Sequence, residues 1–356
     1  MAFDHIMQGD FAGLASENGA LAKRPYISTN GRNAGHSVIT VNTGQLDNTG
    51  QPIYAERRVN VNATLRKDEW INLDNTIIEA AKERLVIVDD LMAAGLTYNV
   101  GGLGTMIAEW ETASEVTDAR ITMDGDTVTE RDKQEFGLNG VPIPLIHKDW
   151  RISERALLAS RTRGAALDVT TGQEMARAVA RTWEGMVFNG GGITTGGYSI
   201  PGLTTFASRE TKTISDWADD VNVTPEEIHT EILEMVQQLE TSARAYGPFT
   251  LYVPGAYAFR FRQDFKEFSD KTLMERVTAE DVISRVRFSD VLATGNVVMV
   301  EMTSRTIDLA MAADVTTVQW QSGSGFTNHF KTYAASAPRL KADFDGRCGI
   351  LHGSTA

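Results

Sequence analysis

The sequence predicts an α+β fold with mixed sheets. Two long segments, around residues 68–94 and 168–189, repeat apolar residues at helical spacing. The second half of the chain instead carries short stretches rich in β-branched and aromatic residues. At 356 residues, the chain is long enough for about two domains. Its one cysteine, Cys348, allows no disulfide within the chain, so we expect a globular protein of a reducing compartment.

The first 63 residues differ in composition from the rest. The stretch STNGRNAGHSVITVNTGQLDNTGQP is rich in Asn, Gly, Thr and Ser and has no helical period. Alone, it would bury too little apolar surface to offset its ordering entropy. We expect a disordered segment or an extended arm that lies on a neighbouring surface. We find no secretory signal and no apolar run of membrane-span length, so we expect a cytosol-like environment and no membrane partner.

Three helices are expected before residue 190. The first runs from Asp68 to Ala94, and Gly95 follows at the position of a left-handed C-cap. Its expected buried face comprises Trp70, Leu73, Ile77, Ala81, Leu85, Val88 and Leu91. A short helix is expected over Ser153–Arg163 and a long one over Asp168–Asn189.

Residues 117–149 predict a two-stranded ribbon that projects from the body. Thr117–Met123 alternates polar and apolar residues, and the DGD that follows offers a hairpin turn. Pro142 and Pro144 exclude VPIPLIHKDWRI from a central strand and favour an edge strand or a ribbon. Because an isolated ribbon is marginally stable in water, we expect it to lie on another surface.

The glycine-rich stretch FNGGGITTGGYSIPGL, residues 188–203, does not predict a nucleotide-binding loop. It follows a long helix, whereas a phosphate loop precedes a helix and uses its N-terminal amides. It also contains no lysine for a Gly-Lys-Ser/Thr ending. Glycine C-caps and a proline turn account for it, so we expect a connector between two lobes.

The second half begins with a strongly signalled helix. Thr224, Pro225 and Glu227 supply its N-cap, first-turn proline and capping-box partner, and Gly247 is expected to end it. Short strands and a helix are expected in FTLYVP, GAYAFRFRQDF, NVVMVEM, TIDLAMA and VTTVQWQ, with further strands in FKTYAASAPRLKADFDGRCGILHG.

The reactive side chains form no convincing catalytic or metal-binding set. Cys348 and His352 lack a second Cys/His pair for a metal, and a buried structural cysteine is more plausible than a Cys–His nucleophile. His147 and Asp149 share a strand face and could form an acid/base pair, although a hydrogen-bonded edge histidine explains them more simply. DGDTVTERD lacks the central Gly and closing Glu of a calcium loop. We therefore predict no enzyme activity, no cofactor and no metal.

The order of these elements resembles one family. The helix LRKDEWINLDNTIIEAAKERLVIVDDLMAAGL is followed by a protruding ribbon, by VPIPLIHKDWRISER, by the helix EMARAVARTWEGMVFNGG and by a glycine-rich connector. The segments GPFTLYVPGAYAFR, DVLATGNVVMVEM and TIDLAMAADVTTVQW complete the order. From about residue 65 to 352, the chain resembles the major capsid proteins of tailed bacteriophages and their relatives, the encapsulin shell proteins.

This resemblance implies the tailed-phage major-capsid fold and its division into parts. The extended loop would lie across a neighbouring subunit, and the axial domain would meet its copies around five- and six-fold axes. The implied parts are an N-terminal arm (1–63), a peripheral domain (64–116), the extended loop or β-ribbon (117–149), a peripheral segment with the spine helix (150–199), the axial domain (200–311) and C-terminal peripheral strands (312–356).

The resemblance implies a structural function. The chain would assemble with itself into hexamers and pentamers of an icosahedral head, in the bacterial cytoplasm, and would reside in the virion around double-stranded DNA. Portal, decoration and separate scaffolding proteins would be partners, since residues 1–63 lack a charged helical scaffolding pattern. The net charge of −13 argues against gripping nucleic acid and suits a container that holds DNA without binding it.

Two other functions remain as alternatives. An encapsulin shell with a cargo enzyme has the same fold, but encapsulins begin close to a helix, whereas a polar arm comes first here. A cytosolic hydrolase is the remote alternative.

Charges on the extended loop are the candidate contact residues. Glu130, Arg131, Asp132 and Lys133 place both signs there, and the resemblance makes them candidates for inter-subunit contact. Some relatives crosslink through a lysine on this loop. Lys133 could take that role, although the sequence marks no partner asparagine.

Overall fold

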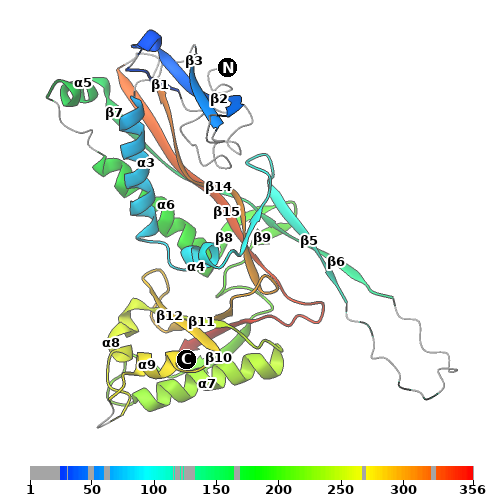
Figure 1. Cartoon of the computed structure of the whole chain (residues 1–356). Helices are drawn as coiled ribbons and strands as arrows, with labels where there is room; N and C mark the ends of the chain where they lie inside the picture. Colours follow the sequence, from blue (N-terminus) through cyan, green and yellow to red (C-terminus); the bar gives the residue numbers. More distant parts are fainter. Residues whose placement is uncertain are drawn as a thin grey trace.

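Two lobes and a projecting ribbon make up the protein (Figure 1). The computed structural model describes residues 25–29, 31–46, 52–59, 65–114, 133–163, 169–266, 270–321 and 326–355, together with positions 116, 121 and 123. Helices and both parallel and antiparallel strand pairs occur, as the α+β prediction with mixed sheets requires.

The first lobe is built on a four-stranded sheet, against which two long helices pack. Its strands, in spatial order, are β4 (Thr97–Asn99), β14 (Ile307–Gln321), β15 (Thr327–Leu340) and β7 (Leu145–Ser153). Its helices are α3 (Lys67–Lys82), α4 (Ile87–Ala93), α5 (Glu154–Arg163) and α6 (Thr170–Asn189). Aromatic rings fill the space between helices and sheet: Phe330 stacks on Trp150 at 4.3 Å and meets Trp70 edge-on at 6.3 Å.

The single helix expected over Asp68–Ala94 is two helices. α3 ends at Lys82 and α4 starts at Ile87. The break is fixed from elsewhere in the chain, because the carboxylate of Glu184 on α6 accepts the N–H of Ile87 at 2.9 Å. The helices predicted over Ser153–Arg163 and Asp168–Asn189 hold to within two residues, and Gly95 adopts the expected left-handed conformation with φ 70°.

The second lobe is built on a five-stranded mixed sheet. In spatial order its strands are β10 (Glu210–Ile214), β16 (Ile350–Thr355), β13 (Asn296–Glu301), β11 (Phe249–Pro254) and β12 (Ile283–Ser289). Its helices are α7 (Pro225–Ser242), α8 (Ala258–Phe261) and α9 (Leu273–Thr278), with the 3-10 turn η2 (Gly255–Tyr257) before α8. The predicted capping box of α7 is present, although this helix ends at Ser242 and not at Gly247.

The C-terminal strands divide between the two lobes. The segments TIDLAMA and VTTVQWQ form one long strand, β14, whose pairing shifts register near Ala313. β15 stays in the first lobe, whereas β16 inserts between β10 and β13 of the second. The resemblance grouped all strands after residue 312 together, and the sheet pairing separates the last of them.

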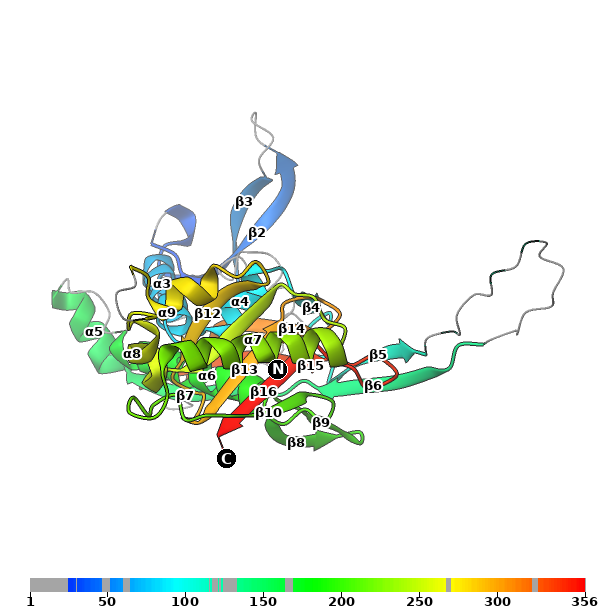
Figure 2. The same ribbon diagram turned by 90° about the horizontal axis from the view of Figure 1, so that it is seen from below.

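Two hairpins leave the first lobe side by side. The ribbon consists of β5 (Ile107–Ala113) and β6 (Phe136–Pro142) and extends away from both lobes in both views (Figure 2). Its described strands therefore start before the expected range of 117–149. The end of that range belongs to β7 (Leu145–Ser153), which is an edge strand of the first lobe and not part of the ribbon. The glycine-rich stretch is not a plain connector, because it forms a second hairpin from β8 (Gly191–Thr195) and β9 (Tyr198–Ile200).

The described part of residues 1–63 is a small folded sheet, which corrects the expectation of a disordered or extended arm. It consists of β1 (Tyr26–Ile27), the 3-10 turn η1 (Gly31–Asn33), β2 (Ser37–Leu46) and β3 (Pro52–Arg58). A buried ring and a shared carboxylate hold it: Tyr26 is 2% exposed, and Glu56 accepts hydrogen bonds from Tyr26 at 3.1 Å and Ser28 at 2.8 Å.

Candidate subunit interface

The ribbon presents apolar side chains to solvent. Residues directly opposite in an antiparallel pair share a face, and the faces alternate along the strands. One face carries the pairs Ile107–Pro142, Glu109–Gly140, Glu111–Leu138 and Ala113–Phe136. We call it the hairpin face, because the β8–β9 hairpin covers its base. Farther out it is bare, with Leu138 57% and Phe136 66% exposed.

The bare part of the hairpin face has the character of a contact surface. Phe136 and Leu138 lie two residues apart on one strand and so point the same way. Grouped exposed apolar side chains of this kind mark interaction sites more often than scattered ones do. Sequence reasoning missed both residues, because an alternating strand looks the same whether its apolar face meets its own core or another subunit.

The charged candidates lie mostly beyond this surface. Glu130, Arg131 and Asp132 lie outside the described residues. Lys133 is exposed and lies three residues before the start of β6. Their inter-subunit role stays a prediction.

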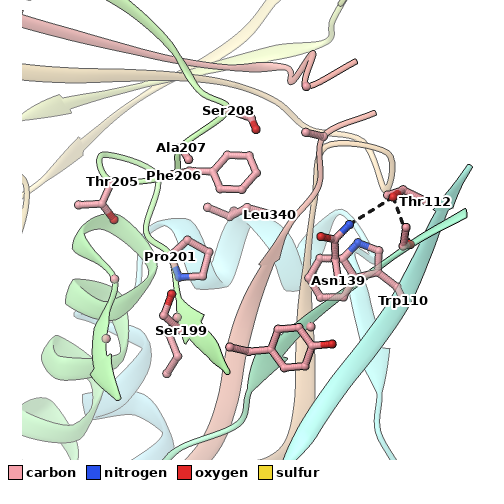
Figure 3. A pocket seen from close by; sticks show the side chains of 18 of the residues that line it. Trp110, Thr112, Asn139, Ser199, Pro201, Thr205, Phe206, Ala207, Ser208 and Leu340 are labelled. Carbon is pink, nitrogen blue, oxygen red and sulfur yellow. Dashed lines mark hydrogen bonds between the residues drawn. The ribbon is translucent and has the colours of Figure 1, made fainter. Parts of the chain in front are cut away.

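A cavity of about 900 Å³ opens where the ribbon meets the lobes (Figure 3). Trp110, Thr112 and Asn139 contribute one wall, while Phe206 and Leu340 lie across from them. Two side chains on the ribbon wall are hydrogen-bonded: Asn139 Nδ2 donates to Thr112 Oγ1 at 3.3 Å, and Thr112 Oγ1 donates to the Gly137 carbonyl at 3.3 Å. The ribbon residues that line the cavity (Trp110, Thr112, Gly137, Asn139 and Gly140) include no acidic or basic side chain, which suits packing better than acid–base chemistry.

The two reactive pairs do not form an active site. His147 and Asp149 do share a face, with 3.8 Å between Nδ1 and Oδ1, but both side chains are about half exposed on the outer edge of the sheet. Lys331 also reaches Asp149, at 3.5 Å. The cavity that His147 lines does not include Asp149 in its wall, so the two side chains do not face a common cavity there.

Cys348 and His352 do not have the properties of a nucleophile and its base. Burial raises the pKa of the Cys348 thiol to about 12, so the nucleophilic thiolate is strongly disfavoured. Burial and the nearby Arg209 lower the pKa of His352, whose ring contacts Arg209 and Asn296. Within the described ranges, no three His, Cys, Asp or Glu side chains gather as metal ligands. No helix there is long and apolar enough to cross a membrane.

A buried polar network joins the two lobes. Asp90 on α4 is 3% exposed and accepts from Arg287 on β12 at 2.6 Å and from the Tyr252 hydroxyl on β11 at 3.2 Å. Glu184 on α6 is fully buried beside it and accepts the N–H groups of α4. Burial raises the pKa of Glu184 to about 7, the N–H bonds oppose the rise, and the charge of Asp90 adds to it.

Solved structures of shell proteins share this architecture. The virus-like particle from Pyrococcus furiosus superposes with a TM-score of 0.57 at 15% identity, covering 81% of this chain and 99% of that one. The capsid of Myoviridae Phage XM1 gives a TM-score of 0.56 at 13% identity, covering 74% and 91%. The protein therefore has the tailed-phage capsid fold, which encapsulin shells share, and the predicted fold is confirmed.

Curated sequence relatives are shell proteins as well. The Type 1 encapsulin shell protein EncA of Myxococcus xanthus is 26% identical over 286 residues, which are 78% of this chain and 90% of the relative. The diheme-cytochrome-encapsulin shell fusion protein of Kuenenia stuttgartiensis is 25% identical over 289 residues, 80% and 73% respectively. A family model matches residues 60–353, and the chain thus belongs to the family of unknown function DUF6260.

Proposed function

We propose that this protein is the major structural subunit of a tailed-phage head, which assembles with copies of itself into an icosahedral shell around double-stranded DNA. The observation that carries the proposal is the bare hairpin face on a projecting ribbon of the capsid fold. Such a ribbon gains little from its own subunit and has its apolar side chains free for a neighbour. The function is structural, without catalysis or a cofactor.

Contact energies of this size suit reversible assembly. Complete burial of a leucine or phenylalanine contributes about 1.5–3 kcal/mol, so covering the exposed parts of Leu138 and Phe136 would contribute roughly 1–2 kcal/mol each. A single misplaced ribbon can therefore dissociate from its neighbour, whereas the many correct contacts of a closed shell together keep the subunits bound. Charges on the loop, Glu130 to Lys133 among them, would add to this contact.

The lobes would take the roles that the resemblance implies. In this proposal the first lobe is the peripheral domain with α6 as its spine helix, and the second lobe is the axial domain that meets its copies in hexamers and pentamers. The net charge of −13 favours a container that does not grip DNA. Portal, scaffolding and decoration proteins would complete the virion in the bacterial cytoplasm.

An encapsulin shell is the second candidate. The two curated relatives, at 26% and 25% identity, favour it. Particles purified from the natural source distinguish the candidates. Nuclease-protected double-stranded DNA inside them would support the phage head. A co-purifying folded enzyme without DNA would support the encapsulin shell.

Electron microscopy of the purified protein, beside size-exclusion chromatography, tests shell formation. Closed shells, tubes or ring-shaped capsomers would support the proposal. A chain that stays monomeric both at high concentration and in the cells that naturally produce it would refute it.

The ribbon contact has its own test. Leu138→Asn should abolish or strongly reduce assembly and leave the thermal unfolding midpoint of the free subunit unchanged, because Leu138 is 57% exposed. The matched control is Leu158→Asn, at a leucine on α5 that is 51% exposed. Full assembly of Leu138→Asn would remove the ribbon from the proposal.

A further inference from the structure

The base of the ribbon is held between two elements. On one side Trp110 lies 5.7 Å from the guanidinium of Arg339 on β15. On the hairpin face, the ring of Tyr198 lies directly over Gly140: a Cβ at Gly140 would stand 2.8–2.9 Å from three ring carbons. Gly140 does not adopt a positive φ, so the tyrosine ring and not the backbone requires glycine here.

The tip of the β8–β9 hairpin makes a second contact with the ribbon. Gly196 and Gly197, with φ 61° and 85°, form the two-residue turn between the paired residues Thr195 and Tyr198. A Cβ at Gly196 would stand 2.7 Å from Cδ1 of Ile107 on β5. Each strand of the ribbon base therefore bears on the hairpin.

A side-chain contact closes the same junction. The Tyr198 side chain lies near Glu109 on β5, and partial burial and the charge of this carboxylate raise the pKa of the tyrosine hydroxyl. The hairpin thus contacts the ribbon through the Tyr198 ring and through its turn.

The root of the hairpin is fixed on α6. The N–H of Leu203 donates to the carbonyl of Val187 at 3.0 Å, and that of Thr204 to Phe188 at 2.9 Å. A Cβ at Gly202 would stand 2.1 Å from the backbone nitrogen of Gly190, so the two ends of the hairpin cross in backbone contact. The hairpin cannot tilt at this root without breaking bonds to the last turn of α6.

We propose that the β8–β9 hairpin is a strut that sets the direction in which the ribbon leaves the subunit, with Tyr198 as the positioning residue that bears on Gly140. The inference rests on the proposed function, because a ribbon of defined direction matters when it must reach a second copy. Without the ring, the ribbon would keep its strand pairing and lose one side of its support.

The direction of the ribbon can be measured on the free subunit. Spin labels at Ala113→Cys, on the ribbon, and Arg181→Cys, on α6, report one distance by double electron–electron resonance. Both positions are exposed, and the native Cys348 is 3% exposed and stays unlabelled. The doubly labelled protein with Tyr198 intact should give one narrow peak.

Four variants in this labelled protein test the strut. Tyr198→Ala should broaden the peak or add a second one, while Tyr198→Phe, which keeps the ring, should restore the narrow peak. Gly140→Ala should displace the peak, because its new Cβ meets the ring. Adding Tyr198→Ala to Gly140→Ala should cancel that displacement and leave the broad peak of Tyr198→Ala alone. Unchanged thermal midpoints would show that each variant is folded.

Two results would overturn the strut. One is a narrow, unmoved peak in Tyr198→Ala. The other is a Gly140→Ala displacement that persists when the ring is absent. Neither depends on assembly, so a subunit with a defined ribbon that forms no shell would refute the proposed function alone. A subunit that assembles normally with Tyr198→Ala and keeps its narrow peak would refute the strut alone.

Discussion

Replacing Glu184 by glutamine should flatten the pH dependence of subunit stability. Glu184 is fully buried, and its folded-state pKa is about 7 against an ordinary value of 4.5. Between these two pH values the unfolded chain releases the proton, whereas the folded protein keeps it. The free energy of unfolding should therefore fall as pH rises from 4.5 to 7 and level off above. Glutamine has no proton to release and should lack this contribution.

The expected size follows from the two pKa values. One pKa unit corresponds to 1.36 kcal/mol, so a rise from 4.5 to about 7 amounts to roughly 3 kcal/mol. Between pH 4.5 and 7, the free energy of unfolding of the wild-type subunit should fall by about 3 kcal/mol more than that of Glu184→Gln. This is a large share of the ~5–15 kcal/mol that is typical of a folded domain. Histidines titrate in both proteins and cancel in the difference.

Urea unfolding of dilute, unassembled subunits at several pH values measures this difference. Tryptophan fluorescence is a suitable probe, since Trp183 is fully buried next to Glu184 in sequence. The control is Glu174→Gln, at a glutamate of the same helix whose side chain is 56% exposed. Parallel pH profiles for wild type and Glu184→Gln would refute the reasoning. They would mean that the N–H bonds from α4 stabilise the charged carboxylate as much as burial opposes it.

Three further substitutions test the packing and the buried polar groups, each by denaturant unfolding. Trp183→Ala removes a side chain with no exposed surface and should cost about 3–5 kcal/mol; a cost below about 1 kcal/mol would contradict its place in the core. Tyr252→Phe removes the hydroxyl that donates to Asp90 and should cost about 1.5–3 kcal/mol; no change would mean that Arg285 and Arg287, which also donate to Asp90, satisfy this carboxylate alone. Arg339→Lys loses one of two 2.6 Å bonds to Asp308 and should lower the unfolding midpoint, whereas an unchanged midpoint would show that lysine suffices.

Helices with complete local signals were predictable. The capping box of α7 and the apolar stripe of α6 lie within the helices they specify, so the sequence shows both their type and their limits. The break between α3 and α4 was not predictable from local sequence. Its fixing group, Glu184, lies about a hundred residues farther along the chain.

Polar and non-local contacts explain the other misses. The N-terminal sheet combines two buried side chains, Tyr26 and Val38, with hydrogen bonds to the Glu56 carboxylate, and no apolar period reveals such a combination. The β8–β9 hairpin lies in a glycine-rich stretch whose order comes from contact with the ribbon and α6. The exposed Leu138 and Phe136 obey the strand pattern, which does not tell what covers a face.

The topology of the second lobe determines when the subunit matures during synthesis. β16 lies between β10 and β13, so the five-stranded sheet stays split until residues 350–355 have left the ribosome. The sheet of the first lobe is also completed late in synthesis, because β4 must pair with β14, some two hundred residues later in the chain. Nascent chains would therefore carry incomplete lobes until late in synthesis. The emergence of β16 would therefore be the step that completes the five-stranded sheet.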